Sequence, residues 1–462
     1  MALTSEIGQF LAGGSPLRVP PAAAAIVKTG FTDCVGVMLA GWREPVVGIV
    51  AAGNGAAAPE HPFAASCLRM PAADRALLYG VAAHVLDYDD TALSGHPSAV
   101  LVPAILAAAQ EAGADGRRMI AAYAAGYEIW SELVARQKDP LHRKGWHPSA
   151  VLGAVAAAGG SAVLRGLDAG QASHAVGIAA SLAGGVVANF GSMTKSLQVA
   201  RAAQSGLVAA RLAQHGMTAS ADAIEHDVGY LQAISMQGRV DRSSPARLGR
   251  EWTILESGLN VKLYPMCYCT HRILDGMLDL RRDHALSACD IAAVAVEIGE
   301  TEAVILRNHR PQNALDAKFS AEFAMAAAAT VGSCGPAELT DAFVRRGEIQ
   351  EFFPRVQIST HPDKVAAQST VDAPNRVVVT LRDGGALDSG PISHPRGHFK
   401  RPIDADRLWG KFAECTAQAM EEAHARALFA QLQELEGVAA VSDLACVRAA
   451  PSQAQPRLER VG

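Results

Sequence analysis

The sequence has no excess of basic residues, few aromatic residues and no regular cysteine pattern. Its 41 lysines and arginines stand against 46 aspartates and glutamates, for a net charge of -5, so a surface that binds nucleic acid is not expected. Only Cys267 and Cys269 of the eight cysteines lie close together, and a Cys-x-Cys pair is a weak zinc signal. We therefore expect reduced thiols, a cytoplasmic location and no nucleic-acid partner.

Signals for secretion or membrane insertion are also lacking. The N-terminal stretch MALTSEIGQF has no basic region followed by a long apolar core. Residues 175–194 are uncharged and about as long as a membrane span, but their glycines and Asn189 favour a buried helix followed by a turn. No membrane partner is expected.

Half of the residues are hydrophobic and only 5% are aromatic, a composition typical of closely packed Ala- and Gly-rich helices. Helical spacing of apolar residues predicts helices over 23–41, 73–86, 101–111, 118–136, 150–165, 172–183 and 197–215. From about 270 to 400 the character changes: β-branched runs predict strands over 292–300, 355–361 and 376–385, with helices over 318–330 and 336–346. Two helices are predicted within 407–435. The chain is therefore expected to be mainly α with a smaller α+β domain.

The stretch HVLDYDDTALSGHPSAV, residues 84–100, places several polar side chains between two apolar segments. Asp87 and Thr91 are four residues apart and would share one face of a helical turn, and His96 follows within the same loop. His96 could act as a general acid or base, with the other two orienting it or a substrate. Alternatively, Asp89, Asp90 and Thr91 only cap the helix ends.

A second stretch, Gly145-Trp146-His147-Pro148-Ser149, repeats the pattern of residues 95–98: a His, then Pro, then Ser at the start of an apolar helix. Pro and Ser are ordinary helix-starting residues, which explains them without explaining the His. Since helix N-termini attract negative charge, the two imidazoles predict a shared anion pocket.

Two lysines stand in irregular segments. Lys195 interrupts the helical pattern in GSMTKS, and Lys262 precedes a Tyr-Pro turn with His271 on the following helix. Either lysine could bind a carboxylate; a surface lysine and a simple hinge are the alternatives. The sequence contains no H-E-x-x-H, G-x-S-x-G or P-loop pattern.

These pieces, in this order, resemble the MmgE/PrpD family. The resemblance rests on LDYDDT and HPS (86–98), GWHPSA (145–150), the segment 191–216, KLYPMCYCTH (262–271), AKFSAEFAMA (317–326) and RPIDADRLWGKF (401–412), which together span almost the whole chain. It implies an all-helical domain over 1–269 and 401–450, an α+β lid domain over 270–400, homodimers, and no metal or organic cofactor. The tail 451–462 is expected to be mobile.

The resemblance carries the family's catalytic positions onto Asp87, His96, His147, Lys195 and Lys262. Substrate-binding positions are expected at Thr91, Lys195, Lys262, Cys267, His271 and Phe323. Two of these depart from the decarboxylase-type members, which have a His in place of Cys267 and a Tyr in place of Phe323. The interval from Thr91 to His96 is also one residue shorter.

The family includes 2-methylcitrate dehydratase, cis-aconitate decarboxylase and iminodisuccinate epimerase. We therefore expect a cofactor-independent lyase that abstracts a proton beside a carboxylate of a small di- or tricarboxylate, with a dehydratase favoured over an epimerase or a decarboxylase. Two other readings stay open. One is a metal-dependent hydratase with His84, His96, His147, His271 and Asp87 as ligands; the other is a catalytically silent homodimer that binds carboxylates.

Overall fold

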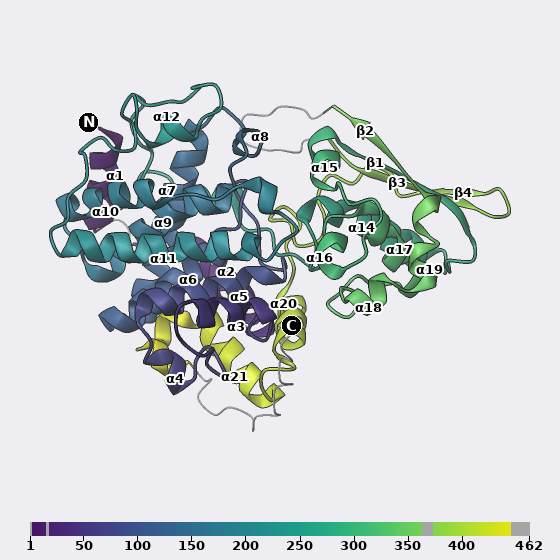
Figure 1. Ribbon diagram of the computed structural model, residues 1–462, viewed down its shortest axis with the longest axis horizontal. Coiled ribbons are helices and arrows are strands. Elements are labelled where there is room, and N and C mark those ends of the chain that lie inside the picture. Colours follow the sequence, from purple (N-terminus) through teal and green to yellow (C-terminus); the bar gives the residue numbers. More distant parts are fainter. Residues whose placement is uncertain (1, 15–17, 363–372, 445–462) are drawn as a thin grey trace.

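The computed structural model describes residues 2–14, 18–362 and 373–444, which form a large helical body and a smaller α+β body (Figure 1). The helical body contains the following long helices: α1 (Leu3–Ala12), α2 (Pro21–Gly41), α5 (Ala72–Val85), α6 (Pro97–Ala112), α7 (Gly116–Arg136), α9 (Pro148–Arg165), α10 (Ala169–Leu182), α11 (Thr194–Gln214), α20 (Ala405–Thr416) and α21 (Glu422–Gln433). Shorter helices are α3 (Pro45–Gly53), α4 (Ala65–Leu68), α8 (Leu141–Lys144), α12 (Tyr230–Ile234) and α13 (Thr253–Ser257).

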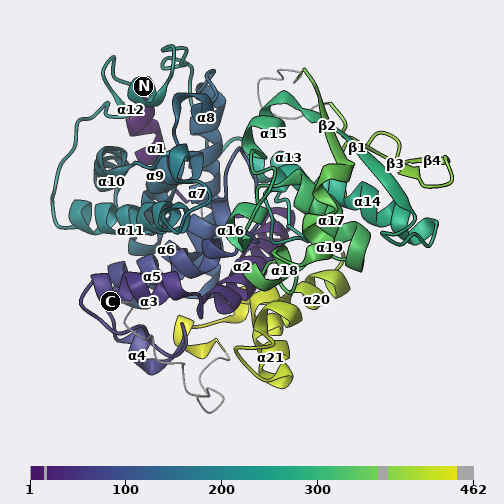
Figure 2. The ribbon, with the colours of Figure 1, turned by 45° about the vertical axis from the view of Figure 1, so that its right-hand side comes forward.

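The α+β body is built on one four-stranded sheet with the strand order β2-β1-β3-β4. Strand β1 (Ile291–Gly299) pairs in parallel with β2 (Val356–His361) and antiparallel with β3 (Arg376–Leu381), which pairs antiparallel with β4 (Ala386–Asp388). Helices α14 (His271–Asp283) and α17 (Ala321–Val331) pack beside the sheet, with the short helices α15 (Glu300–Ile305), α16 (Ala314–Ala317), α18 (Asp341–Val344) and α19 (Gly347–Gln350) around them (Figure 2). The predicted fold class, mainly α with an α+β domain, is confirmed.

Each body has its own apolar core. One core runs through the first helices and is joined by residues of α20 and α21; the other contains residues between Tyr264 and Val379. Helix α20 packs on α2, so the chain returns to the helical body after the sheet. Small residues permit close helix contacts there: a Cβ on Gly206 of α11 would lie 2.5 Å from the Ala157 side chain of α9, which explains a large core with few aromatic residues.

The helix predicted over 336–346 was wrong. Only Asp341–Val344 is helical, because the Thr340 hydroxyl accepts the Phe343 N–H and starts the helix there, and α19 begins separately at Gly347. The short edge strand β4 was not predicted, since three residues after the Gly384–Gly385 turn carry little pattern. The tail 451–462, expected to be mobile, lies outside the described residues.

Two helices, α2 and α9, are long and apolar enough to cross a membrane by length and composition alone. Their most apolar windows are 67% and 94% buried within the protein, and core helices commonly meet the same criteria. The uncharged segment 175–194 is not one continuous helix, because α10 ends at Leu182 and only a short 3-10 helix, Val187–Asn189, precedes α11.

Candidate active site

The loop between α5 and α6 has a strained backbone. Asp87 adopts a φ of +53°, and Leu93 and Ser94 adopt +49° and +62°, in the left-handed region that residues with side chains rarely enter. Each such residue costs about 1–3 kcal/mol unless its surroundings hold it. Lys262 stabilises the strained backbone at Asp87, since its Nζ donates to the Asp87 carbonyl oxygen at 2.9 Å. Strain of this kind is typical of functional loops.

The Asp87 carboxylate lies between two lysines. Its Oδ1 is 2.9 Å from Lys195 Nζ, in the first turn of α11, and 2.8 Å from Lys262 Nζ, on the segment that leads into the α+β body. Asp87 is only 4% exposed and Lys262 only 1%. Burial opposes ionisation of Asp87, but the two ammonium groups hold its pKa well below the usual range. This buried ionic cluster therefore lies where the chain passes from the helical body into the α+β body.

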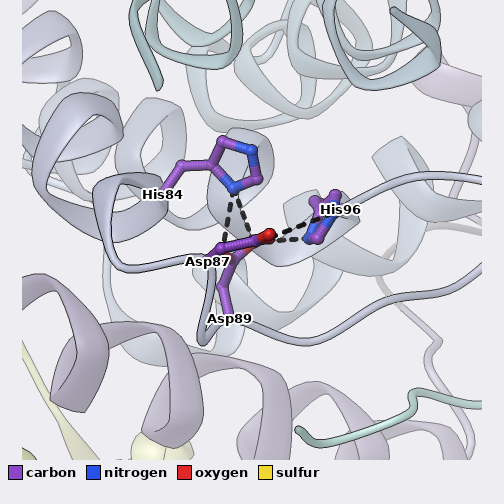
Figure 3. A group of neighbouring side chains, drawn as sticks. All are labelled: His84, Asp87, Asp89 and His96. Atoms are coloured by element: carbon purple, nitrogen blue, oxygen red, sulfur yellow. Dashed lines mark hydrogen bonds and ion pairs between the residues drawn. The ribbon is translucent and has the colours of Figure 1, made fainter. Parts of the chain in front are cut away.

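Asp89 contacts two histidines, His84 at the end of α5 and His96 just before α6. Its carboxylate oxygens are each 3.0 Å from His84 Nδ1, and its Oδ2 is 2.8 Å from His96 Nδ1 (Figure 3). Burial opposes ionisation of Asp89, but His84 and His96 keep its pKa well below the usual range. His96 Nε2 lies 3.9 Å from Asp87 Oδ1, so this ring contacts both carboxylates.

His147 lies at the start of α9, in the same position relative to its helix as His96 before α6. Its Nδ1 is 2.9 Å from the Gln198 side-chain oxygen, and Phe190 contacts its ring edge-on at 4.8 Å between centroids. Burial, with the charge of Lys195 adding to it, lowers the pKa of His147 well below the usual range. At neutral pH this imidazole is uncharged.

The structure brings the two His-Pro-Ser starts together, as the sequence predicts. The His96 backbone N–H donates to the Ser149 hydroxyl at 3.1 Å, and the His84 ring lies 4.5 Å from that of His96 and 6.1 Å from that of His147. Asp87, His96, His147, Lys195 and Lys262 are therefore members of one cluster.

The other expected substrate-binding residues lie in two settings. Thr91 forms a backbone bridge with Asn260, two residues before Lys262. Cys267 is half-buried; a hydrogen bond from Cys269, followed by the nearby Lys262 charge, lowers the pKa of its thiol.

His271 and Phe323 are buried in the α+β body. The His271 ring lies 5.0 Å from those of both Tyr264 and Tyr268, and the Phe323 ring lies 6.3 Å from that of Phe343. Their predicted contact with substrate stays a prediction.

Sequence reasoning missed a third lysine at this site. Lys318 is buried, and its Nζ donates to the Val85 carbonyl oxygen at the end of α5, at 3.1 Å. Burial lowers the pKa of Lys318 to about 8, although the Asp87 charge acts in the opposite direction. Its neighbour Phe319 lies 5.7 Å from Lys195 Nζ. Both residues belong to the AKFSAEF motif, in which only Phe323 was singled out.

Four side chains could in principle hold a metal ion: one ligand atom each from His84, Asp87, Asp89 and His96 lie within 4.8 Å of one another (Figure 3). His147 and His271 of the predicted metal set are not in this group. The carboxylate oxygens that a metal would need are engaged, since both Asp89 oxygens face imidazoles and Asp87 Oδ1 faces two ammonium groups. A divalent cation bound to Asp87 would be repelled by Lys195 and Lys262, whose Nζ atoms lie 2.9 and 2.8 Å from Asp87 Oδ1, so the four residues fit an ion-pair network better than a metal centre.

A cavity of about 940 Å³ lies elsewhere, between α14, the end of α17 and α20. Tyr88 is the only residue of the 84–100 stretch that lines it, and none of the predicted site residues does. The size of this cavity is therefore a poorer guide to the chemistry than the buried ionic cluster.

Comparisons with known proteins agree with the arrangement. The model of the MmgE/PrpD N-terminal domain matches residues 5–243, and that of the MmgE/PrpD C-terminal domain matches residues 264–435. Cis-aconitate decarboxylase of Homo sapiens is 23% identical over 397 residues, which cover 83% of this chain and 81% of that protein. The Mus musculus protein of the same name is 24% identical over 83% of this chain and 80% of its own. Cis-aconitate decarboxylase-like protein oryM of Aspergillus oryzae is 27% identical over 80% of both.

Proposed function

Because the chain belongs to the MmgE/PrpD family, whose two domain models match it over 5–243 and 264–435, we propose that it is a lyase acting on a small di- or tricarboxylate. The single observation that carries this proposal is the pair of lysine ammonium groups on one buried carboxylate. Three buried lysines, Lys195, Lys262 and Lys318, stand against the two ionised carboxylates of Asp87 and Asp89, so the cluster retains a positive charge for an anionic ligand.

The same charges suit the chemistry. Removing a proton or carbon dioxide beside a carboxylate builds negative charge on the ligand, and fixed cations in a dry site stabilise that charge. Lys318, a third buried lysine near Lys195 and Lys262, adds to the field. In this proposal the lysines bind substrate carboxylates and stabilise the charge that develops.

His147 and His96 act as base and acid. His147 is uncharged because burial lowers its pKa, so it can accept a proton. His96 contacts the carboxylates of Asp87 and Asp89, which can balance the charge of a protonated ring. Asp87 and Thr91 orient the acid and the ligand.

Two outcomes of this chemistry have separate support. Loss of carbon dioxide is supported by the name cis-aconitate decarboxylase, which all three relatives above carry in full or in part. Loss of water is supported by the acid and base pair and by Cys267 and Phe323, which depart from the decarboxylase-type motifs. An epimerase, in which two bases face one carbon, uses the same residues.

The test is incubation of the protein with citrate, methylcitrate, cis-aconitate and iminodisuccinate analogues in deuterated water, followed by NMR. Loss of water, release of carbon dioxide, and deuterium incorporation without net loss identify the dehydratase, the decarboxylase and the epimerase. Binding without any turnover would support the silent carboxylate-binding protein instead. Unchanged turnover in both His96→Ala and His147→Ala would contradict the proposed acid and base.

A homodimer is part of this proposal. Leu182 at the end of α10 is 46% exposed, and Val186 and Met193 in the segment before α11 are 43% and 45% exposed. Exposed apolar surface of this kind favours a partner. Light scattering should give twice the chain mass, and Val186→Glu should shift the protein toward monomer. A monomer at micromolar concentration would overturn the dimer without affecting the lyase.

A further inference from the structure

The imidazole of His84 belongs to the cluster but has no role in the proposed reaction. One of its ring nitrogens lacks a hydrogen-bond partner. His84 is at the end of α5 and is 1% exposed. Its Nε2 is buried and has no hydrogen-bond partner among the residues that the structure describes. A buried polar atom without a partner destabilises the fold, so such atoms in folded proteins call for an explanation.

The other ring nitrogen fixes which proton His84 carries. Both Asp89 oxygens lie 3.0 Å from Nδ1, and Figure 3 shows Nε2 on the far side of the ring from Asp89. Asp89 is ionised and only accepts hydrogen bonds, so Nδ1 carries the proton. Burial lowers the pKa of His84 to about 4, although Asp89 acts in the opposite direction. His84 is therefore neutral at pH 7, and its Nε2 presents a lone pair.

This lone pair stands in a site that otherwise offers cations to a ligand. The centre of the His84 ring lies 4.5 Å from that of His96 and 6.1 Å from that of His147, and the charge of Lys195 acts on it. Ligand carboxylates suit lysines, but they cannot satisfy Nε2, which needs a donor. A ligand hydroxyl group supplies that donor.

Resting on the proposed carboxylate site, we propose that His84 is a specificity-determining residue whose Nε2 accepts a hydrogen bond from a hydroxyl group of the bound acid. The Asp89–His84 pair then distinguishes a hydroxy acid from the same acid without its hydroxyl. Sites built to pair a substrate hydroxyl discriminate strongly against analogues that lack it, because the buried acceptor stays unpaired.

The experiment compares citrate with propane-1,2,3-tricarboxylate, which differs only in lacking the hydroxyl, by isothermal titration calorimetry at pH 7. The wild-type protein should bind citrate about tenfold more tightly. Equal affinities would overturn the role of His84 while leaving the carboxylate site intact. If neither acid binds, both this inference and the proposed function fail.

Variants of His84 test whether this residue causes the preference for citrate. His84→Phe should bind both acids with similar affinity, whereas His84→Gln, whose amide oxygen can accept, should retain part of the preference for citrate. His61→Phe is the matched control: His61 is also buried, and burial lowers its pKa to about 4, but it lies in the loop before α4. A preference that persists in His84→Phe would contradict the proposal.

Nitrogen NMR of wild-type protein labelled at histidine keeps the test independent of variant folding. Citrate should move the Nε2 resonance of His84 toward the hydrogen-bonded range, and propane-1,2,3-tricarboxylate should not. The same shift with both acids, or none with citrate, would contradict the assignment.

Discussion

The two His-Pro-Ser helix starts share a sequence pattern but have different chemical surroundings. Both place a histidine immediately before an N-terminal proline of a buried helix, α6 or α9. His96 faces the carboxylates of Asp87 and Asp89, whereas His147 faces the neutral amide of Gln198 and the ring of Phe190. The pattern thus sets the position of each imidazole, while residues distant in sequence set its proton chemistry.

Removing the negative charge of Asp87, the carboxylate that Lys195 and Lys262 share, should have the largest effect on turnover. Asp87→Asn leaves Lys195 and Lys262 buried without their carboxylate and takes away one contact of His96 but none of His147. We expect turnover to fall by roughly 10³-fold or more, with a lower melting temperature because buried charges lose their partner.

The measurement is steady-state kinetics on the substrate identified by the NMR panel, with circular dichroism to confirm folding. Asp74→Asn, in the first turn of α5, is the control and should change neither value. A folded Asp87→Asn protein with wild-type turnover would show that the ionic cluster is structural.

Removing either imidazole should have the next largest effect. His96→Ala and His147→Ala should each lower kcat by about 10²–10⁴-fold, the usual contribution of a general acid or base. If the two roles differ, deuterium exchange at the substrate carbon should survive in His96→Ala and be lost in His147→Ala. The reverse pattern would exchange the acid and base assignments.

A smaller effect is expected from Gln198→Glu, which gives His147 a carboxylate neighbour such as His96 has. Gln198→Glu places a carboxylate at the Nδ1 of His147, which favours the imidazolium and raises its pKa. A base that is protonated at neutral pH is inactive, so the acidic limb of the pH–rate profile should move upward and activity at pH 7 should fall about tenfold.

Rates measured from pH 5.5 to 8.5 would show the shift, with Gln214→Glu at the other end of α11 as control. An unchanged profile would mean that His147 is not the base.

The pH dependence of the unfolding free energy should show that His147 is uncharged in the folded protein. The pKa of His147 is lowered on folding, so below the unfolded value of about 6.5 the unfolded chain binds a proton that the folded chain does not. Its contribution to the unfolding free energy is lost as the pH falls, by about 1.4 kcal/mol per pH unit.

Asp90 and Glu128, whose pKa values burial raises, act in the opposite direction, so the slopes must be compared between proteins. Urea unfolding at pH 5 and 6 should give a smaller loss for His147→Phe than for wild type. Identical slopes would contradict a neutral buried His147.

Removal of metal ions should have the smallest effect. Two lysines at about 3 Å from Asp87 occupy the place where a cation would bind, so dialysis against EDTA should leave turnover unchanged. Loss of activity that added Mg²⁺, Mn²⁺ or Zn²⁺ restores would establish the metal-dependent hydratase instead.

Local patterns predicted much of this structure. Helical spacing gave most long helices to within a few residues, and His-Pro-Ser gave the starts of α6 and α9, because Pro restricts the backbone locally. β-branched runs gave three strands. Their order could not be predicted, since the parallel pairing of β1 with β2 depends on contacts between residues such as Val294 and Val356.

In the candidate site, too, some residues could be predicted from local motifs and others could not. Asp87, His96, His147, Lys195 and Lys262 each lie in a recognisable motif, and the structure brings them together. Gln198 in α11 and Lys318 in the turn after α16 also lie within the family-like segments, but neither was singled out, because a polar residue in the sequence does not show that it will be buried.

The most direct test of the central claim is a crystal structure of the protein with propane-1,2,3-tricarboxylate, an unreactive tricarboxylate. We predict ligand carboxylates within hydrogen-bond distance of Lys195 and Lys262, with the His96 and His147 rings against the carbon chain. A ligand bound instead in the cavity between α14 and α20, with the Asp87 cluster unchanged, would contradict the account.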